Sequence, residues 1–186
     1  MNEMVFCLMF FMMLFLMFQR RPTPPESGVK PVTPESIGRT TRIFAGAFIM
    51  LVVMCACVFY FFGFFVPNVE PAKSPMLAVI RVGATVMLIT LGFIMPTVLV
   101  NIAKARLKDV ADADLMAYLA AIYQGKTLVR LGSLTGAAFV NVFDFILEKQ
   151  FWSYGVVAFL LGVMAISFPS QGQFENWAED MQRELN

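Results

Sequence analysis

The sequence predicts an all-α membrane protein, a polytopic bundle of transmembrane helices joined by short segments. Two features of its composition support this fold class: apolar residues make up 59% of the 186 positions, with 20 Phe and 14 Met, and charged residues make up only 15%. In soluble domains about half of the residues are apolar and about a quarter are charged. The third observation is that the apolar residues form long runs, as helices that cross a bilayer require.

Five apolar runs are candidates for spanning helices, because about 20 helical residues cross the hydrocarbon core. They cover residues 4–18, 43–66, 76–102, 127–147 and 152–168. The first run is as short as the core of a secretory signal, but it follows the acidic Glu3 and ends before Arg20 and Arg21. We therefore expect a retained N-terminal helix and five spans. The alternative is four spans plus a short N-terminal hydrophobic segment that is cleaved or lies on the surface.

The positions of Lys and Arg predict the orientation, because basic residues near spans stay on the cytoplasmic side. With residues 19–42, 103–130 and the C-terminal tail in the cytoplasm, only Lys73, Arg81 and Lys149 of the 14 basic residues lie outside. The N-terminus is then outside and the C-terminus cytoplasmic. A short hairpin, a final span and a Phe-Pro pair at the membrane exit are typical of small bacterial membrane proteins, so we expect the bacterial inner (plasma) membrane.

The chain divides into four segments. They are an N-terminal hydrophobic helix, a Pro-rich cytoplasmic linker, the transmembrane bundle and a cytoplasmic amphipathic tail, at 1–18, 19–42, 43–168 and 169–186. The linker nearly repeats itself, as PTPPES and PVTPES. Proline this dense blocks helix and sheet, so we expect an extended, solvated spacer.

Two short amphipathic helices are predicted on the cytoplasmic side. The first lies in a helical loop at about 103–126, where Asp112 or Asp114 can cap its start and Gly125 can end it. The second is the tail, whose apolar side chains share one face: Phe174, Trp177, Met181 and Leu185. Its other faces are acidic and are repelled by anionic headgroups, so we expect the tail to pack on the protein's own basic loops.

The run 127–147 carries polar residues on one face. At 100° per residue this polar stripe contains Lys126, Arg130, Ser133, Ala137, Asn141, Asp144 and Glu148. We expect the stripe to be turned away from lipid. Beside it, Gly132 and Gly136 form a G-x-x-x-G pair, which lets a neighbouring helix approach closely. The final span, joined by a short hairpin, is one expected neighbour, and the run 76–102 or a second chain is the other.

Depth in the membrane distinguishes the members of the stripe. Arg130 lies in the first turn of the span and Asp144 lies one turn from its outer end, so both should reach headgroups, and they are too far apart to pair. Asn141 and Ser133 lie deeper, and we expect them to form hydrogen bonds between helices. Arg81, in the preceding span, lies towards the same side as Asp144, and we expect these two to form an interhelical ion pair.

The composition argues against enzymatic chemistry and against nucleic-acid binding. The chain has no His, and its net charge is +1. Cys55 and Cys57 are two positions apart, so on a helix they point away from each other. No phosphate-binding loop, nucleophile motif or zinc motif occurs. We therefore predict no catalytic, cofactor-binding or metal-binding residues, and we expect the protein not to be an enzyme.

Two functions remain. The first is a non-enzymatic structural, accessory or assembly subunit that packs with other membrane chains or with copies of itself, with the stripe acting as interhelical glue. The alternative is a small oligomeric channel or transporter, in which the polar stripes of several chains line a path. In both, the lipid bilayer is the surrounding medium.

Overall fold

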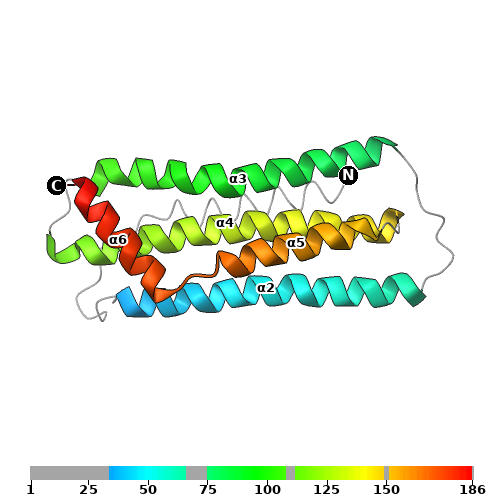
Figure 1. Cartoon of the computed structure of the whole chain (residues 1–186), viewed down its shortest axis with the longest axis horizontal. Coiled ribbons are helices and arrows are strands. Elements are labelled where there is room, and N and C mark those ends of the chain that lie inside the picture. The colour runs from blue at the N-terminus through cyan, green and yellow to red at the C-terminus, as the bar shows by residue number, and fades with distance from the viewer. Residues whose placement is uncertain (1–33, 66–74, 108–111, 149–150, 186) are drawn as a thin grey trace, which may run out of the picture. The chain divides into compact units, whose positions relative to one another are not determined.

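The computed structural model describes residues 34–65, 75–107, 112–148 and 151–185, and all the regular structure in these ranges is helical. The helices are α2 (Pro34–Phe65), α3 (Pro75–Leu107), α4 (Asp112–Glu148), α5 (Trp152–Ile166) and α6 (Gln171–Leu185) (Figure 1). The predicted N-terminal helix at 4–18 lies outside the described residues. So does most of the predicted linker, although its last part, from Pro34, belongs to α2. Proline is well tolerated in the first turn of a helix, where its missing N–H is not needed.

Three of the helices are long and apolar enough to cross a membrane. Their candidate spans are Gly38–Phe61, Pro75–Lys104 and Leu115–Glu148. They contain most or all of the predicted runs 43–66, 76–102 and 127–147. The last predicted run corresponds to α5, which is shorter, with 15 residues. At 1.5 Å per residue such a helix is about 22 Å long, less than the ~30 Å hydrocarbon core.

The central helix is α4. It packs against α3, α2 and α5, and α5 also touches α2. In Figure 1 successive long helices run in opposite directions, with α3 and α2 on opposite sides of α4. Each candidate span contains an apolar stretch of 18 residues. In α4 this stretch is 67% buried, compared with 11% in α2 and 22% in α3. The chain therefore builds its core around α4, and the outer two helices keep most of their apolar surface exposed.

The cytoplasmic loop helix that we predicted at 103–126 is not a separate element. Residues up to Leu107 belong to α3, and α4 begins at Asp112 and continues without a break to Glu148. The prediction that Gly125 ends a helix is wrong. A glycine inside a helix costs only about 1 kcal/mol relative to alanine, and Gly125 is buried among packed neighbours that offset this cost. The side chains of Asp112 and Asp114 lie outside the described residues.

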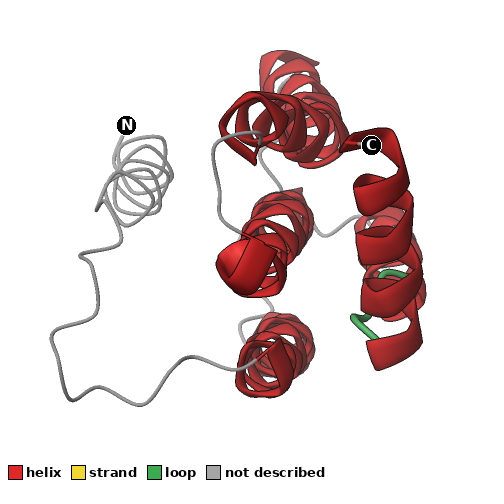
Figure 2. Ribbon diagram, turned by 90° about the vertical axis from the view of Figure 1, so that its left-hand side faces the viewer, coloured by secondary structure: helices red, strands yellow, loops and turns green. Residues whose placement is uncertain are grey.

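The C-terminal tail forms α6, which crosses the first part of α4 (Figures 1 and 2). Its start is a capping box: Ser170 Oγ accepts a hydrogen bond from the Gln173 backbone N–H (3.2 Å), and the Gln173 side chain accepts one from the Ser170 N–H (3.4 Å). The predicted apolar face packs on α3 and α4, where Ala178 and Met181 join Leu107 and Leu119 in a buried cluster. The side chain of Leu185 lies outside the described residues.

Candidate functional site: a buried polar network

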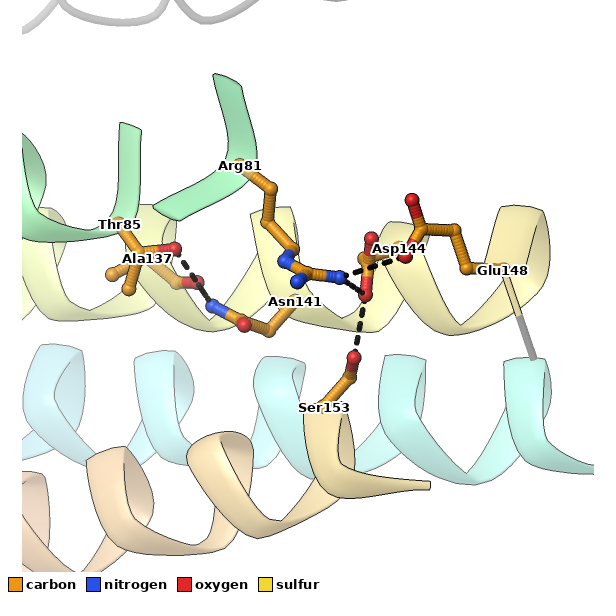
Figure 3. A network of polar contacts seen from close by, with 7 residues as sticks. All are labelled: Arg81, Thr85, Ala137, Asn141, Asp144, Glu148 and Ser153. Atoms are coloured by element: carbon orange, nitrogen blue, oxygen red, sulfur yellow. Dashed lines mark hydrogen bonds and ion pairs between the residues drawn. The ribbon is translucent and has the colours of Figure 1, made fainter. Parts of the chain in front are cut away.

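The polar stripe of α4 faces α3, and three helices contribute to one network near the end of α4 (Figure 3). Arg81 of α3 donates through Nη1 to Asp144 Oδ2 and to Glu148 Oε2, the second at 3.1 Å. Ser153 of α5 donates through Oγ to the same Asp144 oxygen, at 2.5 Å. The predicted ion pair between Arg81 and Asp144 is therefore present, and it is extended by two residues whose pairing we did not predict.

Every member of this network is buried. The relative exposure is 7% for Arg81, 6% for Asp144, 6% for Glu148 and 0% for Ser153. The expectation that Asp144 reaches headgroups is thus wrong in this fold, because α3 and α5 close over it. The guanidinium is also covered by the indole ring of Trp152, whose centroid lies 4.2 Å from Cζ. Arg81 Nε is buried without a hydrogen-bond partner.

The charges of the network explain why its members converge. A charge that is buried without a partner loses several kcal/mol of hydration that nothing replaces, so buried ions are stable only as hydrogen-bonded pairs. Asp144 and Glu148 are one helical turn apart on α4, which brings both carboxylates to one guanidinium. The short hairpin between α4 and α5 brings Ser153 back beside Asp144. The arrangement ties α3, α4 and α5 together through one residue, Asp144.

A second polar contact lies one turn deeper in the α3–α4 interface. Asn141 donates through Nδ2 to Thr85 Oγ1 at 3.0 Å and to the Ala137 carbonyl at 2.8 Å (Figure 3). Asn141 is 1% exposed and Thr85 9%. The predicted role of Asn141 as an interhelical hydrogen-bonding group is confirmed. Ser133 is different: it is buried, but its Oγ has no hydrogen-bond partner, so this part of the prediction is wrong.

A close approach of two helices occurs at Gly92 of α3, a residue that we did not single out. A Cβ atom added to Gly92 would lie 3.1 Å from Ser133 Cβ and 3.5 Å from the Arg130 carbonyl. Ser133 therefore packs on a glycine instead of forming a hydrogen bond. At Gly136 the nearest atoms belong to the Leu88 side chain, at 3.6 and 3.7 Å, so no neighbouring backbone comes close there. Gly132 is buried in the same helix.

The other end of the stripe is basic. Arg130 lies one turn into the predicted run 127–147 and about five turns into α4, since the helix begins at Asp112. Its Cζ lies 4.6 Å from the centroid of the Phe93 ring, and its Nε is buried without a hydrogen-bond partner. Lys126 Nζ lies over two rings, 4.7 Å from Tyr123 and 4.1 Å from Trp177. Within the described part of the chain, neither cation has a carboxylate within ion-pair distance.

Sequence reasoning missed Ser153, Trp152 and Gly92. A signal existed for the first two, because the short hairpin after Glu148 had to bring the start of the final helix beside the end of the stripe. No signal identified Gly92, since many apolar helices contain glycine. Glu148 was placed on the stripe, but its spacing of four residues from Asp144 was not connected to Arg81.

The network is suited to holding helices together. Among the described residues, no group of three or more Cys, Asp or Glu side chains has a geometry that could hold a metal ion. Cys55 and Cys57 of α2 are free thiols, the second exposed.

Comparison of the chain with known protein families, with characterised proteins and with solved structures gives no match.

Proposed function

We propose that this chain is a non-enzymatic integral membrane protein, a structural, accessory or assembly subunit that packs with other membrane chains. One observation supports the proposal above others: the acidic end of the polar stripe is paired within the chain, by Arg81 and Thr85 of α3 and by Ser153 of α5. The stripe acts as internal glue in this arrangement. The apolar outer faces of α2 and α3 are available for contact with other molecules.

These outer faces suit contact with other chains in the membrane. Several methionines are exposed on them, namely Met50, Met54, Met76, Met87 and Met95. Methionine is flexible and polarisable, so it packs against partners of varied shape. An assembly subunit needs a rigid interior and an adaptable exterior. The network around α4 provides the rigid interior, and the methionine-rich faces of α2 and α3 provide the adaptable exterior.

The proposal includes the finer membrane arrangement. It has five spans with residues 4–18 retained, the N-terminus outside and the C-terminus in the cytoplasm of a bacterial inner membrane. The distribution of Lys and Arg supports this orientation.

The alternative, a channel or transporter, is less well supported. Stripes from several chains could line a path only if they faced a space between the chains, and in this fold α3 lies over the stripe at Asn141 and Asp144. A conduction path would require α3 to separate from α4 and to break both contacts. Purified protein in liposomes should therefore show no proton or cation flux above that of empty liposomes.

Site-specific photo-crosslinking in the native membrane tests the proposal. A photoreactive residue is introduced at Met54 of α2 or at Met87 of α3, which are 60% and 63% exposed, and in a control variant at Leu134 of α4, which is 1% exposed. We expect discrete adducts with another membrane chain, or with a second copy, from the outward positions and only intrachain products from Leu134. Adducts with lipid alone from both outward positions, or robust flux in liposomes, would contradict the proposal.

A further inference from the structure

The two halves of the polar stripe differ in how their charges are balanced. At one end, Arg81 meets two carboxylates. At the other, Lys126 and Arg130 follow one another at a spacing of one helical turn, and no described carboxylate pairs with either. A cation inside a membrane-spanning helix is costly unless it has a counter-charge or reaches water. Lys126 and Arg130 are only partly exposed, and no carboxylate among the described residues supplies a counter-charge to this basic end of the stripe.

The residues around this basic pair are of the types expected at the level of a membrane surface. The candidate span of α4 begins at Leu115, but the apolar run 127–147 predicted from the sequence begins directly after Lys126, and Arg130 lies about 6 Å further along the helix at 1.5 Å per residue. Side chains on a helix lean towards its N-terminus, so the Arg130 side chain leans towards Lys126. Tyr123 and Trp177 surround Lys126, and such aromatic residues are enriched at the headgroup level.

The geometry around Arg130 leaves donors available for an anion. Its planar group stacks on Phe93 at 4.6 Å, which fixes the side chain without using a single N–H. Nε is buried with no acceptor, and a buried donor without an acceptor carries an unmet energetic cost. Arginine presents several N–H donors in a fixed fork that matches the oxygens of a phosphate, and lysine adds a point charge.

We propose that Lys126 and Arg130 form a binding site for a phosphate group of net negative charge, of the kind carried by the headgroup of an anionic phospholipid. Basic pockets between transmembrane helices bind such headgroups. The two cations contact a ring of α6 and a ring of α3, Trp177 and Phe93 respectively. Two acidic residues of α6 are paired elsewhere, Glu184 with Lys104 and Glu179 with Arg183. The inference does not depend on the proposed role as a subunit.

Lipid titration of the full-length protein in a neutral detergent tests the site. Native mass spectrometry counts bound molecules as phosphatidylglycerol, phosphatidylcholine or inorganic phosphate is added. We expect phosphatidylglycerol to bind at least about tenfold more tightly than phosphatidylcholine, because one charge-assisted hydrogen bond corresponds to about this factor. Competition by inorganic phosphate at millimolar concentration would identify a free phosphate as the ligand, and its absence would identify the lipid headgroup.

Substitutions connect the binding to the two residues. Lys126→Gln with Arg130→Gln should reduce the preference for phosphatidylglycerol to the level of phosphatidylcholine. Arg39→Gln with Arg42→Gln is the matched control, since both arginines are exposed basic residues of α2, and it should keep the preference. Arg130→Lys keeps the charge and weakens binding severalfold, which provides a test if the double variant does not fold. Equal affinity for both lipids in the unaltered protein, or an equal loss in the control, would overturn the proposal.

Discussion

Arg81 of α3 and Asp144 of α4 form a buried ion pair across 63 positions of the sequence, and the same Arg81 nitrogen also bonds Glu148. Loss of Arg81 and loss of Asp144 should therefore have unequal effects on stability. Among the described residues Arg81 is the single cation that pairs with these carboxylates, whereas each carboxylate can be replaced in part by the other. Removing the cation leaves two buried negative charges, whereas removing one carboxylate leaves one cation paired with one carboxylate.

We predict that Arg81→Met destabilises the protein by about 3–5 kcal/mol, the usual cost of leaving a buried charge without its partner. Asp144→Asn should cost only about 1–2 kcal/mol, because Glu148 keeps Arg81 paired and the amide oxygen still accepts the hydrogen bond from Ser153. Unfolding midpoints in detergent measure both. Arg81→Lys keeps the charge and should fall between the two, and equal losses for the first two variants would contradict this order.

Residue patterns predicted the membrane helices and the polar stripe because burial in lipid demands long apolar runs, and a helix repeats every 3.6 residues. They predicted the pair of Arg81 with Asp144 because few charges lie within the runs. The end of the first cytoplasmic helix could not be predicted, because tertiary packing offsets the helix-breaking tendency of Gly125. The roles of Ser153 and Gly92 depend on which helices meet at which level, and local periodicity does not contain that information.

The hydrogen bond between Asn141 and Thr85 allows a pairwise test of the α3–α4 interface. Asn141→Leu places a branched apolar group at a position that is 1% exposed and removes two hydrogen bonds, so we expect a loss of about 2–3 kcal/mol. Thr85→Val keeps the shape and should cost about 1 kcal/mol. In a double-mutant cycle the coupling should be about 0.6 kcal/mol, the average for such bonds in a membrane. Strictly additive effects would mean that the bond contributes nothing.

The docking of α6 should depend on its apolar face more than on its ion pair. Met181 is 3% exposed in the cluster with Leu107 and Leu119, so Met181→Ala should cost about 2 kcal/mol. The pair of Lys104 with Glu184 is partly exposed, and Glu184→Gln should cost less than about 0.5 kcal/mol. Limited proteolysis at the α5–α6 connection reports the docking. Faster cleavage in Glu184→Gln than in Met181→Ala would mean that the ion pair contributes more to the docking of α6 than the apolar face does.

The proposed topology makes a prediction that reporter fusions can check. Reporters placed in 22–36, in 108–114 and at the C-terminus should report the cytoplasm, and one in 67–75 should report the outside, because this arrangement puts most Lys and Arg inside. Intact-mass measurement should find residues 1–18 attached. A cytoplasmic reporter after residue 72 would mean that the topology is inverted. Loss of about 20 N-terminal residues, the length of a signal segment, would remove one span.

The close approach at Gly92 leads to the sharpest comparison, because α3 contains a matched glycine. In Gly92→Ala the new Cβ would lie 3.1 Å from Ser133 Cβ, an atom fixed to the backbone of α4, so the two helices must move apart. We expect a loss of about 1–3 kcal/mol, as overpacking of a tight interface usually costs. Gly83→Ala is the control: nothing lies within 4 Å of its added Cβ, and alanine favours the helix, so stability should be unchanged or slightly higher.

Restoring the space should restore the stability. Combining Gly92→Ala with Ser133→Gly removes the opposing Cβ and leaves only the Arg130 carbonyl, at 3.5 Å, which is an ordinary contact. The double variant should therefore lose less stability than the sum of the two single losses, with a favourable coupling of about 1 kcal/mol between the sites. Thermal unfolding of the four proteins in one detergent measures this coupling. If the two losses simply add, α3 and α4 do not meet at Gly92 and Ser133, and the order of contacts from Arg81 to Arg130 along the stripe is incorrect.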